Sequence, residues 1–142
     1  VYSPRPSVTT IANAMDVGDP SNFARILDLY GNDIEKIRAD ISGCRFGDAQ
    51  IAECISTVYK TYGYTLDPHG ACAYLGLEKG LCEGETGLML ETAHPAKFPE
   101  RVEPVIKRKI EIPDTLTRFL SGEKQTVAMS SRFPDFKHWL LR

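Results

Sequence analysis

Residues 87–98 read Gly-Leu-Met-Leu-Glu-Thr-Ala-His-Pro-Ala-Lys-Phe, and this stretch decides the predicted fold. Residues 87–92 form a short, nearly continuous apolar run after a turn rich in Gly and Glu. Such a run is typical of a strand that is buried on both faces, as in a parallel sheet. The pattern therefore predicts an α/β fold with a short parallel-sheet strand over 87–92.

The rest of the chain is predicted to be mostly helical. Apolar residues recur at helical spacing, and Gly or Pro residues stand near the ends of most of these segments. The expected helices cover residues 23–30, 33–42, 48–62, 70–79, 98–106, 113–121 and 133–141. One strand cannot form a sheet by itself. The sequence therefore indicates that part of the fold lies outside this chain.

Three details of these helices are specific enough to be checked. Asp48 is expected to cap the helix over 48–62. Pro99 and Pro104 are expected to break or kink the helix over 98–106, because an interior proline removes a hydrogen bond. In the final helix, the apolar residues expected to point inward are Phe133, Phe136 and Leu140.

Composition limits the classes of protein that the chain can belong to. It has 142 residues, of which 42% are hydrophobic and 25% charged, as in ordinary globular proteins. The net charge of −2 argues against general nucleic-acid binding, which needs a basic surface. No apolar run approaches the roughly 18 residues that cross a bilayer. Four cysteines without a Cys-x-x-Cys pair suggest reduced thiols in a cytoplasmic protein.

The beginning of the sequence carries no visible signal peptide. Val1 is not an initiator methionine, so we expect the chain to start inside a longer protein or after processing.

Thr92 is the first candidate site residue, because it stands at the end of the predicted strand. Ligands of open α/β sheets bind at the carboxyl ends of the strands, where a hydroxyl group can serve a cofactor ring nitrogen. The alternative is that Thr92 only caps the helix that follows.

His69 is the second candidate, within the string Asp-Pro-His-Gly-Ala at 67–71. A helix N-terminus disfavours a charged imidazole. The alternative is that Asp67 caps the helix and the His69 ring is packed or exposed. A metal site formed by His69, Glu91 and His94 is rejected, because their spacing matches no established ligand pattern; no metal is expected.

A third candidate segment, 14–22, reads Ala-Met-Asp-Val-Gly-Asp-Pro-Ser-Asn before a predicted helix. A helix start of this kind can hold an anion such as phosphate. The alternative is a turn and a helix cap alone.

Together, three strings resemble the threonine synthase family, in its longer bacterial and fungal form. They are Asn-Ala-Met-Asp-Val-Gly-Asp-Pro-Ser-Asn-Phe at 13–23, Asp-Pro-His-Gly-Ala at 67–71 and Glu-Thr-Ala-His-Pro-Ala-Lys-Phe at 91–98. Their order and spacing also match, and the resemblance runs from about Tyr2 into the final helix.

The resemblance implies a fold-type II pyridoxal-phosphate enzyme with two α/β domains and the cofactor between them. Such a lyase converts O-phospho-L-homoserine and water into L-threonine and phosphate in threonine biosynthesis. Residues 1–142 would then complete the large cofactor-binding domain of a longer protein, against its N-terminal remainder. Thr92 would bind the pyridine nitrogen of the cofactor. The other candidates, for substrate binding, are Asn13, Asp16, Ser21, Asn22, His69, His94 and Lys97.

The chain departs from the family pattern at the residues that perform the chemistry. The family's Schiff-base lysine lies in a His-Gly-Pro-Thr-x-x-Phe-Lys-Asp string, and its phosphate loop reads Gly-Asn-Phe-Gly. Neither has a counterpart here, and Lys97 belongs to a different string. No catalytic residue is therefore expected in this chain, which should be inactive alone and should expose apolar surface that favours self-association.

Two other functions stay open at this point. The chain could be a non-catalytic helical interaction module that keeps the scaffold without the chemistry. It could also belong to a sister phospholyase of the same fold, which acts on a related phosphorylated amino alcohol.

Overall fold

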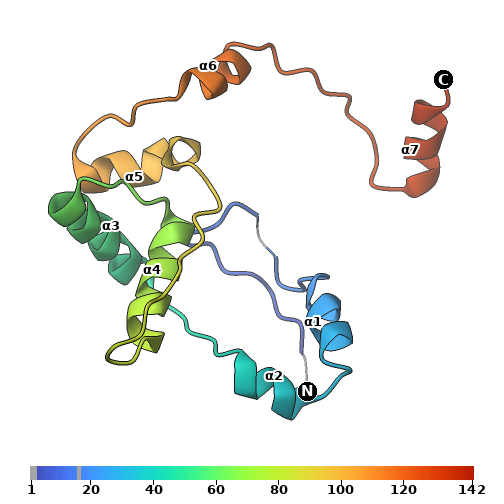
Figure 1. Cartoon of the computed structure of the whole chain (residues 1–142). Helices are drawn as coiled ribbons and strands as arrows, with labels where there is room; N and C mark the ends of the chain where they lie inside the picture. Colours follow the sequence, from blue (N-terminus) through green and yellow to red (C-terminus); the bar gives the residue numbers. More distant parts are fainter. Residues whose placement is uncertain (1–2, 16) are drawn as a thin grey trace. The chain divides into compact units, whose positions relative to one another are not determined.

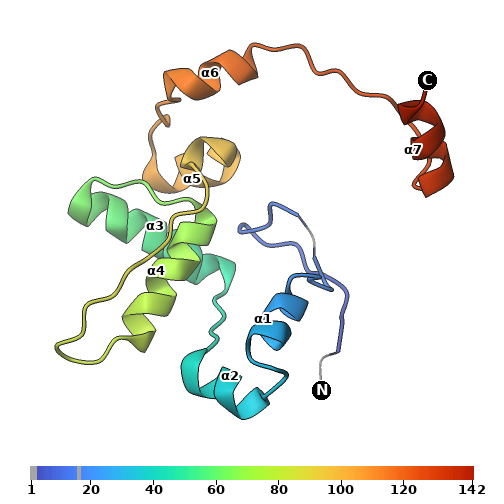
Figure 2. The ribbon, with the colours of Figure 1, turned by 45° about the vertical axis from the view of Figure 1, so that its right-hand side comes forward.

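The structure is a computed structural model that describes residues 3–15 and 17–142 (Figures 1 and 2). The chain divides into two units, Val1–Glu111 and Ile112–Arg142. Its helices are α1 (Phe23–Leu29), α2 (Ile34–Asp40), α3 (Asp48–Tyr62), α4 (Pro68–Gly80), the 3-10 turn η1 (Pro95–Lys97), α5 (Pro99–Ile106), α6 (Asp114–Leu120) and α7 (Phe133–Leu140). Among the described residues, no helix is both long and apolar enough to cross a membrane.

The hydrophobic core of the first unit lies where α3 packs against α4 and α5. Ile51, Ile55 and Val58 recur at helical spacing on α3, and all three are buried. Tyr62, at the end of the same helix, is 68% exposed. The other buried apolar residues are Cys54, Leu66, Ala71, Phe98, Val102 and Ile106.

A small residue lets α3 and α4 approach each other closely. Ala71, near the start of α4, is fully buried. Its carbonyl oxygen accepts a weak hydrogen bond from the buried thiol of Cys54 on α3, at 3.7 Å. A larger side chain at position 71 would separate the two helices.

The N-terminal segment is fastened to this core by two polar contacts. Arg101 of α5 donates to the carbonyl oxygen of Thr10 at 2.6 Å, and the amide of Ile11 donates to Asp48 at 3.2 Å. Asp48 is therefore not the helix cap that the sequence predicted. Gly47 takes the N-cap position of α3, and Gln50 accepts the hydrogen bond from its amide at 3.0 Å.

Residues 87–92 are not a strand, so that prediction was wrong. Within the described residues the chain there has no regular secondary structure, and Leu88 and Leu90 are 85% and 71% exposed. A strand exists only when its backbone groups pair with a neighbour, and the described part of the chain offers no partner strand. The apolar run therefore lies on the surface as an extended loop.

The two prolines of α5 do not break the helix. Pro99 occupies the first helical position, where a missing amide hydrogen has no consequence. Pro104 is exposed and lies inside the helix, which ends two residues later. Lys107 then adopts a left-handed conformation with φ of 55°.

The second unit contains α6 and α7 and buries little of their apolar surface. Phe133, Phe136 and Leu140 are 71%, 43% and 62% exposed, so the prediction that they point inward was wrong. A unit of this size has too few residues to form a core around them. Its local order comes from contacts such as the ion pair between Arg132 and Asp135, at 3.0 Å.

Truncation of Ile55 tests the core. Ile55 is fully buried, so Ile55→Ala should reduce the free energy of unfolding by about 2–5 kcal/mol. Ile34→Ala makes the same change at a site that is 46% exposed and should change it by less than about 0.5 kcal/mol. Urea unfolding followed by circular dichroism measures both. Equal losses in the two variants would contradict the assigned core.

Candidate functional site

A buried carboxylate begins α4. The side chain of Asp67 is inaccessible to solvent, and its oxygens accept hydrogen bonds from the amides of His69 at 2.8 Å and Gly70 at 3.4 Å. The ring Nδ1 of His69 also donates to Asp67, at 2.7 Å. Asp67 is thus the helix cap, as the alternative for this segment had it, and its negative charge lies at the positive end of the helix dipole.

Glu91 reaches this helix start from the loop before η1. Its Oε1 accepts from the backbone amide of Asp67 at 3.1 Å, and its Oε2 is buried without a hydrogen-bond partner among the described residues. Gly70 makes the approach possible, because a Cβ atom there would collide with the Glu91 carboxyl oxygens. We call these two acidic residues the Asp67–Glu91 pair.

The pKa values of the two carboxyl groups are shifted in opposite directions. Burial raises the pKa of Glu91 to about 7; the hydrogen bond from the Asp67 amide opposes this, and the Asp67 side chain acts in the same direction as burial. Burial also opposes ionisation of Asp67, but hydrogen bonds from the His69 amide, Glu91 and the His69 ring outweigh it and lower the pKa of Asp67. Asp67 is therefore the anion of the pair and Glu91 the group that retains its proton.

Thr92, next to Glu91, presents its side chain to solvent. It makes no hydrogen bond to the residues that the structure describes. It does not cap the following turn, because that position belongs to His94, whose Nδ1 accepts from the amide of Ala96 at 3.1 Å. The alternative that Thr92 is only a helix cap is therefore wrong.

Of the other candidates, His69 belongs to the same helix start, whereas His94 and Lys97 lie in and beside η1. The His69 ring contacts the Phe98 ring, with centroids 5.3 Å apart, so His69 is packed as well as hydrogen-bonded. His94 and Lys97 are exposed. Because Nδ1 of His94 accepts a hydrogen bond, its Nε2 carries the hydrogen in the neutral ring.

The N-terminal candidates occupy a different part of the first unit. Asn13 stabilises a turn, in which Thr10 donates to its side chain at 2.9 Å and it donates to the Val8 carbonyl at 3.3 Å. Ser21 and Asn22 are exposed before α1, and Asn22 is its N-cap without a side-chain hydrogen bond. Asp16 lies outside the described residues.

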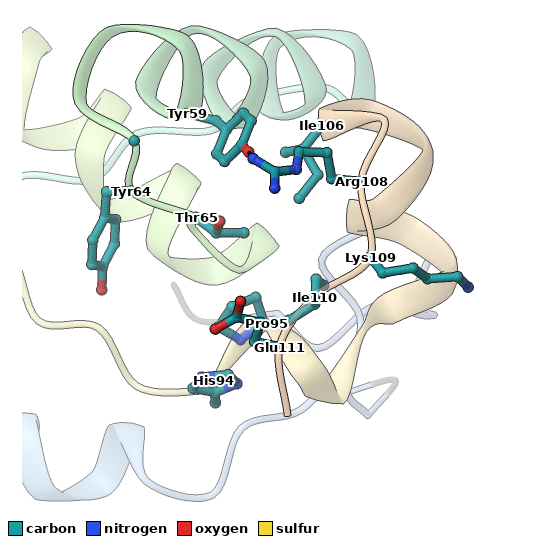
Figure 3. Close-up of a pocket in the computed structure, with 11 residues that line it drawn as sticks. Tyr59, Tyr64, Thr65, His94, Pro95, Ile106, Arg108, Lys109, Ile110 and Glu111 are labelled. Atoms are coloured by element: carbon teal, nitrogen blue, oxygen red, sulfur yellow. Dashed lines mark hydrogen bonds between the residues drawn. The ribbon is translucent and has the colours of Figure 1, made fainter. Parts of the chain in front are cut away.

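A pocket of about 390 Å³ opens beside His94 (Figure 3). Arg108 lies across it and donates to the hydroxyl of Tyr59 at 3.1 Å, whereas Lys109 points away and pairs with Glu103 at 2.8 Å. The Glu111 carboxylate faces the same space, so the lining carries both signs of charge.

Sequence reasoning missed the role of Glu91 and Gly70. It considered Glu91 only as a metal ligand. The available signal was a glycine two residues after Pro68, inside a helix start, where alanine would favour the helix more. Such a glycine indicates the close approach of another group.

Comparisons with known proteins identify relatives of this chain. The family described as "Threonine synthase, C-terminal" matches residues 70–137. The threonine synthase of Buchnera aphidicola from Acyrthosiphon pisum is 41% identical over 143 residues, which cover 99% of this chain and 32% of that protein. The threonine synthase of Escherichia coli is 37% identical over 115 residues, covering 81% of this chain and 26% of that protein.

Solved structures show the same relationship in three dimensions. The crystal structure of threonine synthase from Escherichia coli superposes with a TM-score of 0.84 at 30% identity, covering 99% of this chain and 32% of that one. The PLP-bound threonine synthase from Brucella melitensis shares the fold, with a TM-score of 0.81 at 23% identity, covering 98% of this chain and 35% of that one.

The chain spans about a third of the length of the curated relatives that it matches most fully. Their similarity extends over nearly all of its residues and is accompanied by the match to the C-terminal family model. The chain therefore belongs to the threonine synthase family, as a segment homologous to its C-terminal portion.

Proposed function

We propose that this chain forms the C-terminal part of a threonine synthase that uses pyridoxal phosphate. The whole enzyme is a cytoplasmic carbon–oxygen lyase of fold type II that converts O-phospho-L-homoserine and water into L-threonine and phosphate. The observation that carries this proposal is the 41% identity to a threonine synthase over 99% of the chain. The PLP-bound relative from Brucella melitensis supports the choice of cofactor.

The residues present fit one contact to this cofactor. Thr92 offers an exposed neutral hydroxyl without a partner in the described part of the chain. A hydroxyl can both donate and accept, so Thr92 suits a ring nitrogen in either protonation state. The nearest acidic side chain, Glu91, is engaged with Asp67 and does not compete for that role.

Pyridoxal phosphate, when bound, supplies an electron sink for bond breaking at the substrate carbons. The chain's contribution is to orient the ring. A neutral Thr92 hydroxyl does not enforce full protonation of the ring nitrogen, as a carboxylate would. That moderation suits elimination and replacement chemistry.

Substrate binding is assigned first to the exposed residues on the same segment as Thr92. The Lys97 ammonium group can pair with a phosphate, and the Nε2–H of His94 can donate to one. His69 is already bound to Asp67, which leaves it a supporting role. The N-terminal candidates Asn13, Asp16, Ser21 and Asn22 form a second group at a helix start.

The N-terminal remainder of the same protein is the proposed partner, with residues 1–142 completing the large cofactor-binding domain. The exposed side chains of Leu88 and Leu90 support this, because apolar residues adjacent along an extended loop favour contact with another surface. The chain alone should bury them by self-association.

The first test concerns activity of the isolated chain. Residues 1–142 contain no string resembling the family's lysine motif or phosphate loop, so with pyridoxal phosphate they should release no phosphate from O-phospho-L-homoserine. The full-length protein should release phosphate and form threonine, and should prefer this substrate to O-phosphoethanolamine. Turnover by the isolated chain would contradict the proposal that the catalytic residues lie outside residues 1–142. A preference for O-phosphoethanolamine would favour a sister phospholyase.

The second test removes the Thr92 hydroxyl in the full-length protein. Thr92→Val keeps the shape but loses a hydrogen bond of about 0.5–1.5 kcal/mol. Cofactor affinity, measured by absorbance titration, should weaken about two- to tenfold, and phosphate release should fall further. Thr92→Ser should restore most of both, and Thr86→Val, an exposed site in the same loop, is the matched control. If Thr92→Val behaves like Thr86→Val, Thr92 does not contact the cofactor.

A further inference from the structure

The Asp67–Glu91 pair contains a buried carboxyl oxygen that lacks a hydrogen-bond donor within the described part of the chain. Oε2 of Glu91 is buried and receives no hydrogen bond from a conventional donor among the described residues. Asp67, its neighbour, already accepts from two amides and an imidazole. A buried carboxylate oxygen without a donor is unfavourable beside a second carboxylate, whereas a protonated carboxyl group carries no charge and can itself donate. The hydrogen bonds to Asp67 favour its anion, so the proton of the pair belongs on Glu91.

We propose that Glu91 is a positioning residue, whose neutral carboxyl group fastens the loop at residue 91 to the first turn of α4 and so places the adjacent Thr92 hydroxyl. In this proposal Oε1 accepts from the Asp67 amide, and the buried Oε2 carries the proton, which removes an uncompensated charge beside Asp67. This inference rests on the proposed role of Thr92 toward the cofactor ring.

Gly70 gives a second, independent way to test the contact between Glu91 and the start of α4. Its missing side chain is the space that the Glu91 carboxyl group occupies. Gly70→Ala introduces a better helix former at an α4 position without altering any titratable group. If helix propensity alone determined the effect, Gly70→Ala would be more stable than the unchanged protein. If the contact with Glu91 determines it, the added methyl group displaces the Glu91 carboxyl group and the variant is less stable.

The protonation of Glu91 makes the device sensitive to pH. The titratable groups that face Glu91 are Asp67 and His69 at the start of α4, and Tyr64 in the preceding loop. The pKa of Glu91 rises from 4.5 to about 7 on folding, so its contribution to stability is complete below about 4.5 and is lost as the pH rises through about 7. The lowered pKa of Asp67 acts in the opposite sense and at more acidic pH, so the two effects separate.

The experiment uses full-length protein with Glu91 unchanged, Glu91→Gln, Glu91→Ala or Gly70→Ala. Glutamine mimics the neutral acid, since its amide donates to Asp67 and its oxygen accepts from the Asp67 amide. The melting temperature of the cofactor-free protein and the dissociation constant for pyridoxal phosphate are measured from about pH 5 to about pH 8.5.

In the unchanged protein, the melting temperature should fall and the dissociation constant should rise about three- to tenfold across the transition. Glu91→Gln should make both profiles flat. Glu91→Ala and Gly70→Ala should bind the cofactor weakly at every pH. A parallel decline in the unchanged protein and Glu91→Gln overturns the inference, as does a flattened melting profile with no change in cofactor binding.

Failure of the proposed function gives a different result. A full-length protein that binds pyridoxal phosphate but forms no threonine would overturn the proposed reaction and leave the two pH profiles readable. A full-length protein that does not bind pyridoxal phosphate at all overturns both the reaction and the placement of Thr92.

Discussion

The carboxylate of Asp67 is the interaction on which the candidate site depends. A charge that is inaccessible to solvent is stable only when hydrogen bonds replace its lost hydration. Here the amides of His69 and Gly70 and the His69 ring do so, and each of these bonds fixes another group in space. These hydrogen bonds order the first turn of α4, because their donors belong to that turn. Burial beside this charge also raises the pKa of Glu91.

The packing of α3 determines how that helix start is presented. Because α3 contacts both α4 and α5, one apolar face holds the segments before and after the 81–94 loop. The loop itself has few buried side chains, and its exit at η1 is fixed by Pro95 and Phe98, which are both buried. Thr92 thus lies between Glu91, which is bound to the start of α4, and the turn η1. The rest of the 81–94 loop is mostly open to solvent.

Local patterns predicted more of this structure than non-local ones did. The buried stripe of α3 and the Asp67 cap follow from neighbours within a few residues, so the sequence contains them. The strand predicted at 87–92 depends on a partner, and the burial of Phe133 and Phe136 depends on a core. The described residues contain no partner strand, and the second unit forms no core around the two rings. The contact of Glu91 with Asp67 joins residues 24 positions apart and depends on the space at Gly70. A pattern of neighbouring residues cannot identify a partner at that distance along the chain.

The buried thiol of Cys54 can report on the separation of α3 and α4. It is buried between α3 and α4, and burial raises its pKa to about 11, so an alkylating reagent meets neither access nor a thiolate. Cys44 and Cys82 are exposed thiols in the same chain. Fast labelling at the exposed pair and slow labelling at Cys54 would separate surface reactivity from the rate at which the two helices part. The chain thus contains its own probe of local opening.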